Sequence, residues 1–235
     1  MLKRKIDNYI QNYYKTTRNA LLITGARQIG KTYSIRKFGK SFKSFVEINF
    51  IDNPEAIDVF KGAKNSTDIL FRLSAMTTVP LIKGETLIFF DEVQKYPEIV
   101  TAIKFLVDEG SYRYILSGSL LGVELKDLRS EPVGYMGIKD MYPLDFEEFI
   151  SCIGINDNVI TALRDAWKDR TPVDEFIHSK IMELFRAPEL LSLIWQKLRR
   201  VCASSAVCMW RLSAMGHHLG RLCRTRCIGG IVIPY

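Results

Sequence analysis

Residues 20–32 read ALLITGARQIGKT, an apolar run that leads directly into a glycine-rich turn. The turn, residues 25–32, fits the pattern G-x-x-x-x-G-K-[ST]. The apolar run predicts a buried β-strand before the turn, and the residues after it predict a helix. In this setting the backbone N–H groups of the turn and the positive end of the helix dipole bind phosphate groups. The stretch therefore predicts a strand, a phosphate-binding loop and a helix in succession.

The residue types in this loop match the needs of a nucleoside triphosphate and its cation. We expect Lys31 to contact the β- and γ-phosphates as a compact cation, and the Thr32 hydroxyl to ligate the Mg²⁺ that bridges them. Arg27 is either a further phosphate contact or an outward-pointing spacer. A turn that only solves a backbone problem is the alternative for the whole stretch. The remaining residues expected to bind the nucleotide are Gly25, Ala26, Arg27, Gln28, Ile29 and Gly30.

A second apolar run, TLIFFDE at residues 86–92, ends in two carboxylates. Parallel α/β sheets bind ligands at the carboxyl ends of their strands, so Asp91 and Glu92 are expected near the phosphate loop. This is the Walker B pattern. Asp91 is expected to hold Mg²⁺ through a water molecule, and Glu92 to orient or deprotonate the attacking water. The alternative is a solvated acidic loop after a core strand.

A third strand is predicted at residues 112–116 and runs into Ser117-Gly118-Ser119. A hydroxyl at the end of this strand could sense the γ-phosphate or help to hold the water, which makes Ser117 and Ser119 candidate catalytic residues. Ser-Gly-Ser is also ordinary turn chemistry. The order of loop, acidic strand and polar-ended strand along the chain favours the catalytic interpretation.

Strands alternate with helices along most of the chain, which predicts an α/β fold with a parallel sheet flanked by helices. Residues 45–50 and 135–141 are expected to form further strands, and residues 55–61 and 67–76 helices. The expected organisation is an N-terminal helix in residues 1–18, a P-loop core in 19–150, the start of a short helical region in 151–186, and an atypical tail in 187–235.

Composition limits the class of protein. The chain has 235 residues, of which 47% are hydrophobic, enough for a substantial core. No stretch approaches the roughly 18 uncharged apolar residues of a membrane span, and residues 1–5 (MLKRK) lead into a polar segment rather than a signal-peptide core. A cytoplasmic location without membrane association is expected.

The net charge of +7 lies entirely in residues 190–235, which contain no Asp or Glu. Because the rest of the chain is balanced, the charge gives little support for a nucleic-acid partner. This segment also holds most of the cysteines. A zinc site is one alternative for it, although its cysteine spacing lacks a C-x₂-C pair. The ligands of such a site would be drawn from Cys202, Cys208, His217, His218, Cys223 and Cys227.

Four segments together give the chain a family resemblance. They are TGARQIGKT (24–32), FDEVQ (90–94), ILSGS (115–119) and MYPLDFEEF (141–149). On these segments, residues 1–186 resemble the bacterial and archaeal AAA-type ATPases whose P-loop domain precedes a DUF4143 domain. The last segment is more diagnostic of this family than the phosphate loop, which many unrelated NTPases share.

The resemblance implies an ASCE-type P-loop fold, in which the polar-ended strand separates the loop strand from the acidic strand. It also implies ATP and Mg²⁺ as ligands, but no particular cellular substrate. Many AAA-type ATPases complete their site with an arginine from a neighbouring subunit. A homo-oligomer is therefore compatible with the resemblance, and Arg129 is a remote candidate for such a contact.

Members of this family continue into a domain that resembles restriction-endonuclease-type nucleases. The chain is accordingly expected to be a truncated ATPase portion. Because the tail has no acidic residue from position 190 onward and gains Cys, Trp and Arg, we hypothesise that residues 187–235 arise from an out-of-frame translation. The function expected is ATP binding with Mg-dependent hydrolysis. Two alternatives stay open: a non-catalytic, truncated nucleotide-binding module, and a DNA-associated regulator.

Overall fold

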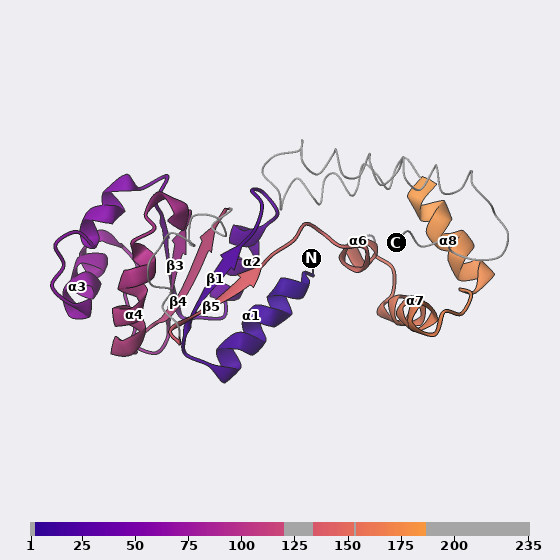
Figure 1. Cartoon of the computed structure of the whole chain (residues 1–235), viewed down its shortest axis with the longest axis horizontal. Helices are drawn as coiled ribbons and strands as arrows, with labels where there is room; N and C mark the ends of the chain where they lie inside the picture. Colours follow the sequence, from indigo (N-terminus) through magenta and orange to yellow (C-terminus); the bar gives the residue numbers. More distant parts are fainter. Residues whose placement is uncertain (1–2, 120–133, 153, 187–235) are drawn as a thin grey trace. The chain divides into compact units, whose positions relative to one another are not determined.

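The computed structural model describes residues 3–119, 134–152 and 154–186 (Figure 1). The chain divides into two compact units, one formed by Arg4–Pro143 and the other by Met1–Lys3 with Leu144–Tyr235. Arg129 and the cysteine-rich tail lie outside the described residues. None of the helices in the described ranges is long and apolar enough to cross a membrane.

The first unit is built on a parallel sheet of five strands in the order β2-β3-β4-β1-β5. Strand β4 pairs with β1 on one side and with β3 on the other, so the polar-ended strand separates the loop strand from the acidic strand. The predicted fold class is confirmed. The strands are β1 (Ala20–Thr24), β2 (Ser44–Asn49), β3 (Thr86–Asp91), β4 (Arg113–Gly118) and β5 (Met136–Asp140).

Helices cover both faces of this sheet. Because successive side chains of a strand point to opposite faces, neighbouring residues enter two separate cores. Leu21 and Phe89 pack on the side of α1 and α2, whereas Leu22 and Phe90 pack on the side of α3 and α4. Burial on both faces explains why β1 and β3 read as continuous apolar runs. The helices are α1 (Lys5–Thr16), α2 (Lys31–Gly39), α3 (Ser66–Met76) and α4 (Ile99–Glu109).

Two expectations about secondary structure need correction. Strand β4 continues through Ser117 and Gly118, which pair in register with Ile23 and Thr24 of β1, so Ser117 lies in the strand rather than after it. The segment expected as a helix at 55–61 is instead a 3₁₀ helix, η1 (Pro54–Val59). Its proline lies at the first turn, where no N–H donor is needed, and the left-handed Gly62 comes shortly after its end.

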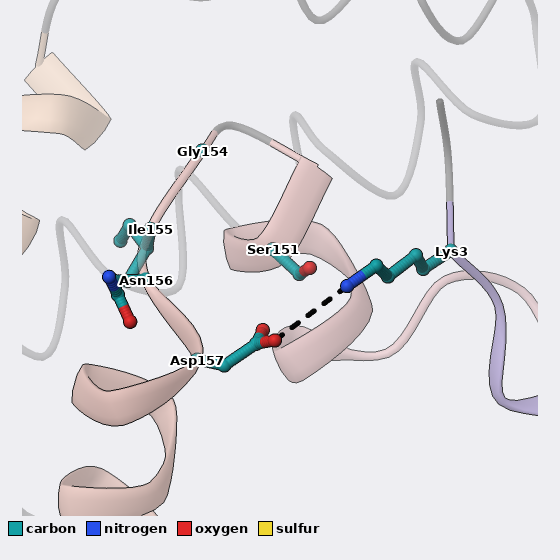
Figure 2. A pocket seen from close by; sticks show the side chains of 6 residues that line it. All are labelled: Lys3, Ser151, Gly154, Ile155, Asn156 and Asp157. Carbon is teal, nitrogen blue, oxygen red and sulfur yellow. Dashed lines mark ion pairs between the residues drawn. The ribbon is translucent and has the colours of Figure 1, made fainter.

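The second unit contributes α6 (Phe146–Cys152), α7 (Asp157–Asp169) and α8 (Glu175–Arg186). A small apolar cluster of Phe149, Ile150 and Ile160 joins α6 to α7. An open pocket of about 320 Å³ lies beside the turn between these two helices (Figure 2). Lys3 pairs with Asp157 there at 3.7 Å, and both side chains are mostly exposed. Such a pair contributes about 0–1 kcal/mol.

Candidate nucleotide site

The glycine-rich loop connects the end of β1 to the first residue of α2. Gly25 has φ +139° and Gly30, the residue before α2, has φ +96°, conformations that side chains rarely allow. Gly25 is also crowded, since a Cβ added there would lie 2.2 Å from the Met141 carbonyl oxygen. The two glycines of the pattern are therefore required by the backbone. Within the loop, Arg27 is exposed, which favours the outward-pointing alternative for this residue.

Lys31 folds back over the loop that precedes it. Its ammonium group donates to the carbonyl oxygens of Gly25 at 3.0 Å and Ala26 at 2.7 Å. The residue is only 8% exposed, and burial lowers the pKa of its ammonium group, while the nearby carboxylates of Glu92 and Asp91 act in the opposite direction. A desolvated cation enclosed by the loop is well suited to bind a phosphate group.

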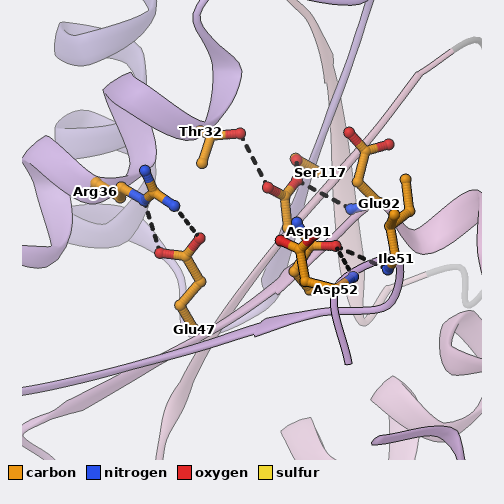
Figure 3. A network of polar contacts seen from close by, with 9 residues as sticks. Thr32, Arg36, Glu47, Ile51, Asp52, Asp91, Glu92 and Ser117 are labelled. Carbon is orange, nitrogen blue, oxygen red and sulfur yellow. Dashed lines mark hydrogen bonds and ion pairs between the residues drawn. The ribbon is translucent and has the colours of Figure 1, made fainter. Parts of the chain in front are cut away.

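Asp91 at the end of β3 is the centre of a polar network (Figure 3). Its Oδ2 accepts from the Thr32 hydroxyl at 3.0 Å, and its Oδ1 accepts from the Glu92 N–H at 3.0 Å and from the Ser117 hydroxyl. Burial raises the pKa of the Asp91 carboxyl, although the hydrogen bonds from Ser117 and Thr32 lower it. Three residues predicted from separate segments thus meet at one point.

These oxygen atoms fit the ligand preference of Mg²⁺, which takes carboxylate, hydroxyl and phosphate oxygens. In the described part of the chain, no group of three or more His, Cys, Asp and Glu side chains could hold a metal ion by itself. A cation held by Thr32 and Asp91 would need further oxygen ligands, such as phosphate oxygens and water.

Glu92 follows Asp91 in a left-handed conformation with φ +58°, which is uncommon outside glycine. Its carboxylate accepts a hydrogen bond from the Gln94 side chain. Gln94 also donates to the Ser119 hydroxyl at 3.1 Å and accepts from the Ser119 N–H at 3.2 Å. Ser119 is thus joined to Glu92 through Gln94. Sequence reasoning gave Gln94 no role, although it lies inside the FDEVQ segment.

Arg4 is a second residue that sequence reasoning missed. It precedes α1, is 5% exposed, and donates to the carbonyl oxygens of Ile29 at 2.8 Å and Tyr142 at 2.7 Å. Arg4 therefore joins three segments by hydrogen bonds: the N-terminal segment, the glycine-rich loop and the chain after β5. No local pattern in the sequence signals this contact.

The end of β2 completes the edge of the sheet next to Asp91. Asn49 pairs with Asp91 in the β2–β3 register. Its side chain accepts from the N–H groups of Ile51 at 2.8 Å and Asp52 at 3.2 Å, which turns the chain away after the strand. Nearby, Arg36 of α2 forms a two-point ion pair with Glu47 of β2 at 2.8 and 2.7 Å (Figure 3). This ion pair connects α2 to β2 on the side of Asp91.

Several solved structures are similar to this chain. They include the Walker-type ATPase PABY2304 of Pyrococcus abyssi (TM-score 0.44, 14% identity, 94% of this chain and 77% of that one). C. elegans PCH-2 (TM-score 0.43, 10% identity) is matched over 97% of this chain and 66% of that one. A structure of Pif1 helicases unwinding forked double-stranded DNA (TM-score 0.37, 14% identity) is matched over 68% of this chain and 48% of that one.

Comparison with curated proteins gives no match. The family model described as "AAA domain" matches residues 17–150, which is more than half of the 235 residues. The matched range contains the glycine-rich loop, the acidic strand and the polar-ended strand. The chain therefore belongs to the AAA domain family, and this range is its P-loop nucleotide-binding domain.

Proposed function

We propose that this chain binds ATP together with Mg²⁺ at residues 25–32 and hydrolyses it. The observation that carries the proposal is the network around Asp91, in which Thr32 of the loop, Asp91 of β3 and Ser117 of β4 are joined by hydrogen bonds. A loop that only solved a backbone problem would not require a buried carboxylate and a buried lysine beside it.

The residues divide the work of phosphoryl transfer. The loop backbone and Lys31 bind the phosphates, and Thr32 and Asp91 would hold Mg²⁺, which neutralises phosphate charge when bound. Glu92 orients the attacking water and accepts its proton. The water oxygen bonds to the γ-phosphorus, the bond from that phosphorus to the bridging oxygen breaks, and ADP and phosphate leave. Ser117 keeps the Asp91 carboxylate in place.

Adenine is proposed as the base because no guanine-reading N-K-x-D motif occurs in the chain. The resemblance to the ATPases with a DUF4143 domain supports the same nucleotide. We further propose that residues 19–150 form the ATPase core and 151–186 begin a helical region. The family match over residues 17–150 supports this extent of the core. The compact units divide earlier, between Pro143 and Leu144, so that α6 groups with the helical region.

The proposal is tested by calorimetric titration of Mg·ATP into the full chain and by a phosphate-release assay. We expect saturable binding by the wild type that is lost in Lys31→Ala, and turnover that is lost in Glu92→Gln while binding survives. A folded wild-type chain that binds no Mg·ATP would refute the proposal. Binding without turnover would instead favour the non-catalytic nucleotide-binding module.

An oligomeric requirement is tested by the same phosphate-release assay. If a neighbouring subunit supplies an arginine to the site, the rate per molecule rises with protein concentration. We expect this rise, followed by a plateau at concentrations where assembly is complete. A rate per molecule that does not depend on concentration, with a monomeric mass in solution, would exclude an arginine supplied by a second copy.

A further inference from the structure

We propose that Gln94 is a positioning residue for hydrolysis, which holds the Glu92 carboxylate in a single direction by tying it to Ser119 at the end of β4. The inference rests on the proposed function, because it concerns how the water-activating residue is oriented. It also gives Ser119 a role different from direct contact with the water or the γ-phosphate.

The backbone brings Gln94 back over the strand ends. Glu92 leaves β3 with φ +58° and ψ +42°, and the chain then enters the 3₁₀ helix η2 (Val93–Lys95). The Lys95 N–H donates to the Glu92 carbonyl oxygen at 3.0 Å, and Val93 is fully buried beneath the turn. A left-handed residue costs about 1–2 kcal/mol outside glycine. The tight turn that follows brings the side chain of Gln94 beside that of Glu92.

The orientation of the Gln94 amide is determined by its partners. The Ser119 N–H is a donor only, so the amide oxygen must face it, as it does at 3.2 Å. The amide nitrogen then faces the Ser119 hydroxyl at 3.1 Å and the Glu92 carboxylate. A flipped amide would place its oxygen against the Glu92 carboxylate oxygen. It would also place its NH₂ group against the Ser119 N–H, which would then be unpaired. The donor presented to Glu92 is therefore held in one direction.

Strand β4 in this way positions both carboxylates of the acidic pair. Ser117 lies within β4, and Ser119 directly follows the last residue of that strand, Gly118. Ser117 donates directly to Asp91, and Ser119 acts on Glu92 through Gln94. Both serines are buried, at 0% and 7% exposure, so neither contact is a surface interaction. An oriented carboxylate is what a water-activating group requires, since geometry limits general-base catalysis before acidity does.

The test compares the wild-type chain with Gln94→Ala, Gln94→Glu, Ser119→Ala and the double variant Gln94→Ala/Ser119→Ala. Gln11→Ala is a matched control, because Gln11 is an exposed glutamine of α1. For each variant we would measure the Kd for Mg·ATP by calorimetry, and kcat and KM by phosphate release. Thermal unfolding of each variant reports whether the fold is kept.

We expect Gln94→Ala to lower kcat about 10-fold or more, in the range of other residues that orient a functional group, with a Kd within about twofold of the wild type. Ser119→Ala should also lower kcat. The double variant should lose no more than Gln94→Ala alone, because the two side chains act in one chain of contacts. Gln94→Glu should also lower kcat, since a carboxylate cannot donate the hydrogen bond that the Gln94 amide nitrogen gives to Glu92.

Three results would overturn the inference. A kcat for Gln94→Ala within twofold of Gln11→Ala would exclude a positioning role while the proposed function stands. Loss of Mg·ATP binding in parallel with kcat would assign Gln94 to the general structure of the site. A wild type that binds Mg·ATP without turnover would refute the proposed hydrolysis and the inference with it. If Gln94→Ala does not fold, the near-isosteric Gln94→Glu decides, and a kcat within twofold of Gln11→Ala would refute the role.

Discussion

Replacing Gly25 with alanine should destabilise the first unit far more than replacing an unhindered glycine. The new Cβ would lie 2.2 Å from the Met141 carbonyl oxygen and 2.9 Å from Cδ1 of Ile29. The carbonyl has little room to retreat, because the Met141 N–H is bonded to the Thr24 carbonyl oxygen at 2.8 Å and Arg4 holds the next carbonyl, that of Tyr142. The backbone conformation at φ +139° adds strain of its own.

The magnitude follows from these two effects. Strain in a region reserved for glycine costs about 1–3 kcal/mol, and forcing an extra carbon into a packed site costs a similar amount. Gly25→Ala should therefore lose about 2–6 kcal/mol of unfolding free energy. Gly62→Ala is the control, since Gly62 has φ +66° with nothing within 4 Å of an added Cβ. Strain alone predicts a loss of about 1–2 kcal/mol there.

Urea unfolding, followed by far-UV circular dichroism without nucleotide, measures the free energy of unfolding of both variants and the wild type. The Gly25→Ala variant that remains folded should also bind Mg·ATP more weakly, because its loop is displaced. If the two variants differ by less than about 1 kcal/mol, the close approach of the loop to Met141 does not limit this position. That result would refute the explanation of Gly25 as a residue required by the backbone.

Three further outcomes are expected. Because burial raises the pKa of Asp91, its ionised form is disfavoured in the folded chain, and wild-type stability falls as the pH rises through this pKa. Asp91→Asn should thus be more stable than the wild type at pH 7 without nucleotide. Urea unfolding near pH 3 should show no such difference in stability. A stability difference that does not depend on pH would contradict the argument. Because burial lowers the pKa of Lys31, its charge is lost at a lower pH than that of an ordinary lysine. Calorimetry should show the affinity for Mg·ATP falling as the pH rises toward 10, whereas constant affinity would show that the ammonium charge is not needed. Arg4→Met removes the donor to the Ile29 and Tyr142 carbonyls and should lower the free energy of unfolding in urea by about 1–3 kcal/mol. Arg36→Met breaks an ion pair whose arginine side chain is 59% exposed and should lower it by about 0–1 kcal/mol. Equal losses in the two variants would refute the distinction.

The sequence predicted the elements around the site well because their signals are local. The apolar run at residues 86–92 and the glycine spacing at 25–32 each specify a conformation through residues that are neighbours along the chain. The strand order agreed with the resemblance to AAA-type ATPases. The end of β4 was predicted less well, because Ser117 joins the strand through pairing with Ile23, a residue far away in the sequence.

The roles of Gln94 and Arg4 show where such reasoning stops. A glutamine after two carboxylates has no periodicity that marks it, and an arginine before an amphipathic helix reads as a surface residue. Arg4 is buried because its guanidinium meets the Tyr142 carbonyl 138 positions away. The contact exists only once β1 and β5 are paired and the chain after β5 passes behind the loop.

The sequence by itself determined the conformation of the phosphate loop, the strand ends that carry Asp91 and Glu92, and the parallel α/β class, because glycine freedom and apolar periodicity act over a few residues. Only the tertiary structure decided which polar groups meet. Thr32 and Asp91 are 59 positions apart, and Gln94 and Ser119 are 25 apart. Their contacts depend on strand order and register, which bring distant carboxyl ends to one edge of the sheet.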